Sequence, residues 1–289
     1  MPDPISVVTG DYPHTAKLKS TTGFAGATAE FPHISPVHDA FDDMVRIQKY
    51  DVCEMAIGAF FQAHEAGKPL LLLPAVMVGG FHYKSIQVAP DAVPVAPADL
   101  RGKRIGVRSY SQTTGLWVRG WLSADYGVTP GSVTWVTTEG SHSDAYHDPA
   151  NVVRTENSLP DDLRDGQISA AILGAGAPAD LRPLIPDWED QSRRWYARHQ
   201  TVPINHMVTA TRDLVERRPD VLHAVYQAIG EGTAESAAAA EPGALPSAIR
   251  CGLSQVREAV RLGADYALEQ GLISRPIEDI DSLFAFKGE

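Results

Sequence analysis

A run of hydroxyl and amide side chains, Ser-Tyr-Ser-Gln-Thr-Thr at residues 109–114, follows a short apolar run directly. The pattern after it predicts a helix over 111–126, so these side chains open a helix. Free backbone N–H groups at a helix start, together with hydroxyls, bind anions such as carboxylates. One hydroxyl is enough to cap the helix, so capping alone does not account for the other hydroxyl side chains in this segment. We therefore predict a carboxylate site with Ser109, Tyr110 and Thr113 as binding residues.

Two histidines stand where a proton donor is expected. His206 lies in a strand predicted over 201–208, and His14 follows the predicted first strand over 5–9. Histidine titrates near neutral pH without any perturbation, so it suits proton transfer to a substrate. A hydrogen-bonded core histidine at 206 and a simple surface turn after the first strand are alternatives that stay open. The neighbours expected to contact substrate are Asp11, Tyr12 and Asn205.

Glu54 lies near the start of a helix predicted over 51–66. A carboxylate at that position complements the helix dipole, or, if it faces a crevice, acts as a general acid or base. On the helix predicted over 111–126, Trp117 and Arg119 are two residues apart and cannot share a face. We expect Trp117 in the core and Arg119 in a pairing at the surface or between lobes.

His82, between two predicted strands, and His142, in a polar loop over 137–158, are further candidates for substrate binding. No HExxH or similar ligand spacing occurs, so no protein metal site is predicted. Cys53 and Cys251 form no CxxC pair, which excludes a cysteine zinc site and makes a disulfide framework improbable.

Composition and missing motifs exclude several function classes. The chain of 289 residues has a formal charge of −11, which disfavours nucleic acid and anionic membrane surfaces as partners. No GxSxG, P-loop or GxGxxG motif is present. The first residues have no basic n-region, and the longest apolar stretch, 70–78, contains a proline and is too short for a bilayer. We expect a soluble, cytoplasmic protein with a small-molecule partner, and self-association stays open.

The order of apolar and amphipathic runs is typical of an α/β protein. A Pro-rich segment at 90–97 and the predicted strand beginning near 201 are expected to be the two crossings between lobes. This predicts a first lobe of residues 1–92 and 204–289 and a second lobe of 93–203, with the C-terminal helices on the first. A ligand in such a fold is expected in the cleft between the lobes.

These residues resemble the 4,5-dihydroxyphthalate decarboxylase family over about residues 5–230. The stretches that agree, in chain order, are Gly10-Asp11-Tyr12, Asp51-Val52-Cys53-Glu54-Met55, Leu73-Pro74 with Phe81, Asp99-Leu100-Arg101-Gly102-Lys103-Arg104-Ile105-Gly106-Val107 with Tyr110, Thr113, Trp117 and Arg119-Gly120, and Pro203-Ile204-Asn205-His206 with Arg212-Asp213-Leu214. The resemblance implies a type II periplasmic-binding-protein-like fold and a carboxy-lyase. The chain departs from the family at His82-Tyr83, at Ser109 and at residues 139–142, so we expect the substrate to be either 4,5-dihydroxyphthalate or a related acid.

Loss of CO₂ leaves an electron pair on the ring carbon, and a ring hydroxyl ortho or para to the carboxylate can accept that charge as a keto tautomer. The enzyme then needs no organic cofactor; a divalent metal chelated by a catechol, with His82 and His142 as ligands, stays open. We expect Ser109 and Thr113 to hold the carboxylate, His206 or His14 to donate the proton, and Glu54 with His82 to orient hydroxyls. A non-catalytic binding protein for a small anion, or a biosynthetic enzyme with another reaction, is the competing interpretation.

Overall fold

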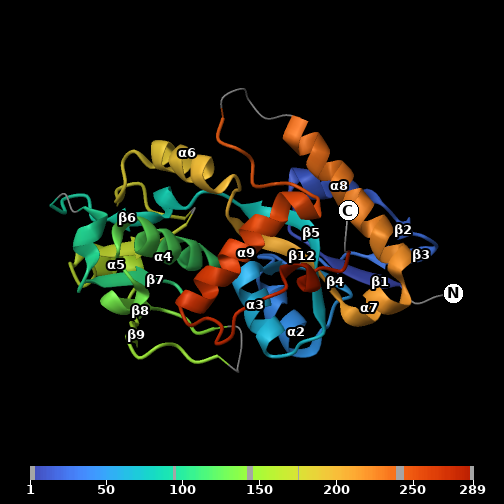
Figure 1. Ribbon diagram of the computed structural model, residues 1–289, viewed down its shortest axis with the longest axis horizontal. Coiled ribbons are helices and arrows are strands. Elements are labelled where there is room, and N and C mark those ends of the chain that lie inside the picture. The colour runs from blue at the N-terminus through green and yellow to red at the C-terminus, as the bar shows by residue number, and fades with distance from the viewer. Residues whose placement is uncertain (1–3, 94–95, 142–145, 175, 239–243, 287–289) are drawn as a thin grey trace. The chain divides into compact units, whose positions relative to one another are not determined.

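The computed structural model describes residues 4–93, 96–141, 146–174, 176–238 and 244–286. Within them the chain forms two compact units (Figure 1). Unit 1 comprises Met1–Gly80, Thr201–Leu262 and Ile277–Glu289, and unit 2 comprises Phe81–Gln200 and Gly263–Pro276. Each unit has its own mixed sheet with helices, which confirms the predicted α/β class.

The sheet of unit 1 has the strand order β2-β3-β1-β4-β12-β5. β1 runs parallel to β3 and β4, whereas β12 is antiparallel to both β4 and β5. The strands are β1 (Ile5–Val8), β2 (Gly23–Phe24), β3 (Ala27–Glu30), β4 (Val52–Ala56), β5 (Leu70–Gly79) and β12 (Ile204–Thr211). The helices that lie wholly in this unit are η1 (Pro13–Thr15), α1 (Ala16–Ser20), α2 (Asp39–Ile47), α3 (Ile57–Glu65), α7 (Arg212–Arg217), α8 (Pro219–Ala238) and η5 (Ile280–Leu283).

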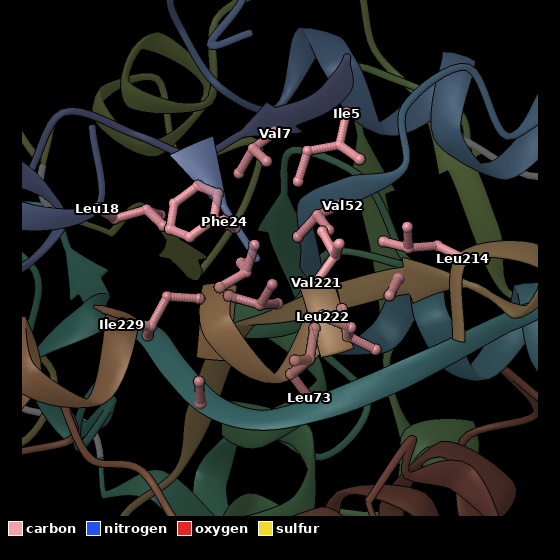
Figure 2. Packing of buried hydrophobic residues seen from close by; sticks show 14 of the residues in the cluster. Ile5, Val7, Leu18, Phe24, Val52, Leu73, Leu214, Val221, Leu222 and Ile229 are labelled. Carbon is pink, nitrogen blue, oxygen red and sulfur yellow. The ribbon is translucent and has the colours of Figure 1, made fainter. Parts of the chain in front are cut away.

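The core of unit 1 forms because apolar side chains on one face of its sheet meet the apolar face of α8. Figure 2 shows Ile5 and Val7 of β1 gathered with Val221 and Leu222 of α8, and all four side chains are buried. Burying a side chain of this size contributes about 1.5–3 kcal/mol, so this face accounts for much of the stability of the unit. α8 also packs against α1 and η1 (Figure 1), which ties the segment after β1 to the sheet.

The sheet of unit 2 has the order β11-β6-β10-β7-β8-β9, parallel from β10 to β9 and antiparallel at β6. Its strands are β6 (Ile86–Val88), β7 (Arg104–Val107), β8 (Thr134–Thr137), β9 (Val152–Arg154), β10 (Ala170–Ile172) and β11 (Arg182–Pro183). Its helices are η2 (Tyr83–Ser85), η3 (Pro97–Leu100), α4 (Thr113–Tyr126), η4 (Pro130–Ser132), α5 (Leu159–Arg164) and α6 (Trp188–His199). α9 (Leu253–Glu269) begins in unit 1 and ends in unit 2.

Three expectations about these elements are wrong. Residues 51–56 do not start a helix, because the segment from Val52 to Ala56 pairs with strands on both sides and is buried as β4. The boundary between the units falls after Gly80, not at 90–97. Residue 90 already belongs to unit 2, where Arg182 donates through Nε to the Pro90 carbonyl at 3.3 Å. Residues Gly263–Pro276 belong to unit 2, where side chains of this segment pack on α4, so 204–289 is not all in the first lobe.

The polar loop expected over 137–158 contains β9, and α6 was not predicted. α6 buries only Ser192 and Trp195, so its apolar stripe is too thin to recognise from periodicity. None of the helices in the described residues combines the length and the apolar character that a membrane crossing requires.

Candidate functional site

A buried carboxylate with three donors lies at the sheet of unit 1. Glu54 has no exposed surface, and its Oε2 accepts a hydrogen bond from the Gly10 backbone N–H at 2.8 Å. Its Oε1 accepts from the Tyr12 hydroxyl at 2.9 Å and lies 2.7 Å from Nδ1 of His206. We call Gly10, Tyr12, Glu54 and His206 the Glu54 cluster. It brings together three of the residues that the sequence singled out.

Strand register explains why these residues meet. In the antiparallel pair of β4 and β12, Glu54 of β4 lies opposite Val208 of β12. His206 is also in β12, two residues before Val208. Side chains two residues apart point to the same face, so Glu54 and His206 are diagonal neighbours. β1 runs parallel to β4, and Val8 at the end of β1 lies opposite Cys53. The residues that follow β1 therefore pass close to Glu54. A Cβ at Gly10 would collide with the Tyr12 ring, so only glycine allows this approach.

The hydrogen bond to Glu54 decides which nitrogen of His206 is reactive. A carboxylate that already accepts two other hydrogen bonds acts as an acceptor here too, so Nδ1 of His206 carries a proton. Nε2 is then the ring nitrogen that can exchange a proton with a ligand. The His206 side chain keeps 21% of its surface exposed, whereas Glu54 keeps none. The edge-on contact with Phe41, at 5.2 Å between ring centres, holds the imidazole from one side.

His14 lies beside the cluster as a support for Tyr12. The two rings stack at 5.0 Å with an interplanar angle of 11°, and His14 Nε2 donates to the Met77 carbonyl at 3.1 Å. Burial lowers the pKa of His14, so its ring is neutral at neutral pH. A neutral ring whose Nε2–H is already bonded is a poor proton donor. The structure therefore favours His206 over His14 for proton transfer.

The Tyr12 hydroxyl stays protonated in this setting. Burial, and then the adjacent Glu54 carboxylate, raise the pKa of Tyr12 well above its usual range. Asp11, by contrast, is exposed and pairs with Lys19, which lowers the pKa of Asp11. Asn205 precedes His206 in β12 and is half-buried. Asp11 and Asn205 stay predictions as substrate contacts.

In unit 2 the segment 109–113 does open a helix, α4, as predicted, but its serine hydroxyls are already used. Ser109 Oγ donates to the Gly140 carbonyl at 2.7 Å, so Ser111 donates to Ser109 across 3.0 Å. Tyr110 is 1% exposed, and its hydroxyl donates to the Gln270 carbonyl at 3.0 Å. The expected substrate contacts through the Ser109 and Tyr110 side chains are therefore not supported. Thr113 begins α4 and is buried, and its role as a substrate contact stays a prediction.

The remaining candidates are more scattered. His82 lies in unit 2 just before η2, and His142 lies outside the described residues. In the part of the chain that the structure describes, no three histidine, cysteine, aspartate or glutamate side chains converge on a common point as metal ligands would. Arg119, expected at a surface or between lobes, is fully buried inside unit 2; this expectation is wrong. Trp117 is buried, as expected.

Gly232 of α8 allows the close approach that positions His14. A Cβ at Gly232 would collide with the His14 carbonyl oxygen, whereas a Cβ at Gly230 would meet nothing within 4 Å. We expect Gly232→Ala to lower the free energy of unfolding by about 1–3 kcal/mol, because overpacking pushes η1 away from α8. Gly230→Ala on the same helix is the matched control and should be neutral or stabilising by up to about 1 kcal/mol. Urea unfolding measures both; equal effects would contradict this tight contact.

No family model matches the chain. It is 29% identical over 197 residues to a 4,5-dihydroxyphthalate decarboxylase from Comamonas testosteroni, covering 60% of this chain and 58% of that protein. It is 31% identical over 140 residues to a protein of the same name from Pseudomonas putida, covering 45% of this chain and 54% of that one. The matches therefore span little more than half of the length of these curated relatives.

Solved structures share the fold at low sequence identity. The alkanesulfonate-binding protein SsuA from Xanthomonas axonopodis pv. citri is 15% identical with a TM-score of 0.55, over 94% of this chain and 95% of that one. A mutant of DszB in complex with biphenyl-2-sulfinic acid is 15% identical with a TM-score of 0.57, over 97% and 96%. The chain thus has the two-unit α/β fold of the type II periplasmic binding proteins, and its sequence is similar to 4,5-dihydroxyphthalate decarboxylases over little more than half of the length of those proteins.

Proposed function

We propose that this protein removes CO₂ from a small hydroxylated aromatic carboxylic acid and that His206 protonates the ring carbon. One observation carries the proposal: His206 is bound through Nδ1 to Glu54, a carboxylate with no exposed surface. The names of the two curated relatives support a decarboxylase. The fold supports neither an enzyme nor a binding protein over the other, because folds do not dictate function.

The Glu54–His206 pair suits this chemistry. The imidazolium donates its Nε2 proton to the ring carbon that carries the carboxylate, while a hydroxyl ortho or para to it releases its proton to water and becomes a carbonyl. The C–C bond then breaks and CO₂ leaves. The bonding electrons restore the aromatic ring and give a phenolate, which takes a proton back from water, so the net proton consumed is the one from His206. Glu54 binds Nδ1 of His206, so Nε2 is the nitrogen presented for proton transfer. The ring itself accepts the electrons, so we propose no organic cofactor.

We propose for Glu54 a different role from the one expected from sequence. Its oxygens are surrounded by donors from Gly10, Tyr12 and His206, and it has no exposed surface. It therefore acts through His206, by fixing the ring orientation and the tautomer, and does not orient the hydroxyls of the substrate itself. Tyr12, whose hydroxyl stays protonated, supports Glu54 in the same way.

The proposed carboxylate-binding segment of unit 2 consists of residues 111–113 at the start of α4. Thr113→Val keeps the shape of this buried side chain and removes its hydroxyl. We expect the variant to bind benzene-1,2-dicarboxylate more weakly by about 1–2 kcal/mol, because one hydrogen bond to a charged group is lost. Isothermal titration calorimetry measures the change. Thr129→Val, at the start of η4, is the matched control and should bind as the unmodified protein does. Unchanged affinity in Thr113→Val would reduce the segment to an ordinary helix start.

The direct test of the proposed function is a panel of hydroxylated aromatic acids with mass-spectrometric detection of CO₂. The panel includes 4,5-dihydroxyphthalate, its monohydroxy analogues and unsubstituted phthalate as the control that lacks an electron sink. We expect CO₂ from acids with a hydroxyl ortho or para to the carboxylate and none from phthalate. Parallel reactions with a chelator and with added Mn²⁺ test the metal alternative. Tight binding of these acids without CO₂ release would overturn the proposal in favour of a binding protein.

A further inference from the structure

A positive charge without a charged hydrogen-bond partner lies inside unit 2. Arg119 of α4 has no exposed surface. The hydrogen bonds of two of its nitrogens go to neutral acceptors: Nε donates to Gln270 Oε1 and Nη2 donates to the Tyr110 carbonyl, both at 2.6 Å. Its third nitrogen, Nη1, has no hydrogen-bond partner among the described residues. Burial lowers the pKa of Arg119, which reflects the cost of holding this charge away from water.

Arg119 and Gln270 together hold the backbone that leads into α4. The guanidinium carbon lies over the Tyr110 ring, 4.1 Å from its centre, and over the Trp135 ring, 5.3 Å from its centre. The Tyr110 hydroxyl donates to the Gln270 carbonyl, and Gln270 Nε2 donates to the Leu116 carbonyl at 2.8 Å. Tyr110 is thus bound at its ring, its hydroxyl and its carbonyl. All the side chains of this arrangement are buried, so it fixes the backbone immediately before the segment 111–113.

The guanidinium is also close to the first turn of α4. A Cβ at Gly115 would lie 2.8 Å from Nη1 of Arg119, so the unpartnered nitrogen faces the turn that follows Thr113. A helix N-terminus already attracts negative charge through its N–H groups and dipole. A full positive charge in a low-dielectric interior adds to this attraction and is screened less than a surface charge. A hydrophobic residue of similar volume would fill the space but supply no charge.

We infer that Arg119 is the positioning residue of the carboxylate-binding segment 111–113: it holds Tyr110 in place and supplies buried positive charge at the first turn of α4. Gln270 shares the holding role. The inference rests on the anion-binding part of the proposed function and is independent of any decarboxylation. It predicts that affinity for organic carboxylates depends on the charge of Arg119, whereas affinity for a neutral analogue of the same shape does not.

The test measures binding of two probes to the full chain by isothermal titration calorimetry. The probes are benzene-1,2-dicarboxylate and the uncharged benzene-1,2-dicarboxamide. Arg119→Met keeps the volume and removes the charge, and we expect it to bind the dicarboxylate about tenfold or more weakly. Its affinity for the diamide, relative to the unmodified protein, should change by less than about twofold.

A second variant keeps the inference testable if Arg119→Met does not fold. Gln270→Glu places a carboxylate where Gln270 Oε1 now accepts from Arg119, so it neutralises the charge with almost no change in shape. The variant also loses the hydrogen bond from Gln270 Nε2 to the Leu116 carbonyl, which the new ion pair with Arg119 offsets only in part. We therefore expect a folded protein with a lower unfolding temperature and about tenfold weaker dicarboxylate binding. A purely structural role for Arg119 would leave affinity unchanged in this variant.

The outcomes separate this inference from the proposed function. Dicarboxylate binding that is unchanged in Gln270→Glu, or absent in the unmodified protein, would overturn the inference. Weaker dicarboxylate binding in the variants, with no CO₂ released from any acid in the panel, would support the inference while the proposed function fails. In an active enzyme, the inference further predicts that Gln270→Glu raises KM about tenfold and leaves kcat nearly unchanged.

Discussion

Replacing His206 with asparagine is expected to lower kcat by about 10²–10⁴-fold, the usual size of a general acid–base contribution. Asparagine keeps a polar side chain of similar reach that can still bond to Glu54, but it carries no titrating proton. Binding should change little, because the variant removes a group that acts in the transition state. Steady-state kinetics with the acid that releases CO₂ fastest in the panel measures both quantities.

A second histidine variant separates the loss of the proton donor from a general effect of losing a histidine. His223→Asn is the matched control, because His223 lies in α8 against Phe286 and outside the Glu54 cluster. Near-normal turnover in His206→Asn would show that His206 is structural and would overturn its assignment as the proton donor.

Replacing Glu54 with glutamine should affect both rate and stability. Glutamine keeps the shape but loses the carboxylate that fixes the orientation and tautomer of the His206 ring, so we expect kcat to fall by about 10²-fold or more. The amide also replaces one carboxylate oxygen by an N–H₂ group. In one orientation this group faces the Gly10 N–H, and in the other it faces the Tyr12 hydroxyl and His206 Nδ1, all of which are donors. One buried donor then stays unsatisfied, which should lower the free energy of unfolding by about 1–3 kcal/mol.

The role of Glu54 can be read directly from the His206 ring. In ¹⁵N NMR spectra the unmodified protein should show His206 protonated at Nδ1, and Glu54→Gln should shift the population toward the other tautomer. Glu216→Gln is the control, because Glu216 is exposed and makes only an i, i+4 pair with Arg212. A Glu54→Gln variant with unchanged kcat and an unchanged His206 spectrum would contradict the positioning role.

Several parts of the Glu54 cluster could be recognised from local sequence. His206 stands in a run that is typical of a strand, and Gly10 and Tyr12 follow the first strand, where ligand-binding residues of α/β proteins gather. The sequence singled out Glu54 but placed it in a helix, whereas it lies in β4. The segment 51–56 continues without a break into α3, and a short apolar run cannot be assigned to strand or helix by periodicity alone.

The hydroxyl-rich segment at 109–113 shows the opposite case. Its place at the start of α4 was predicted correctly from the switch in periodicity. The availability of its side chains was not, because Ser109 donates to Gly140 and Tyr110 to Gln270. Arg119 was misplaced for a related reason. Its partner Gln270 lies 151 residues further on, and no local pattern signals a guanidinium that is buried on neutral acceptors.

The sequence by itself determined the α/β class, the first strand, the helix that begins near residue 111, the strand that carries His206, and the similarity to the decarboxylases. These follow from local periodicity and from motifs, which depend on residues near one another in the chain. Only the tertiary structure decided that Glu54 binds His206, 152 residues away. It also decided that His14 is hydrogen-bonded to the Met77 carbonyl and that the Tyr110 hydroxyl is hydrogen-bonded to the Gln270 carbonyl. The physical reason is that hydrogen-bond partners are set by strand order and register. In this fold β12 pairs with β4 although Glu54 and His206 are 152 residues apart in the sequence. No local property of either segment encodes that pairing.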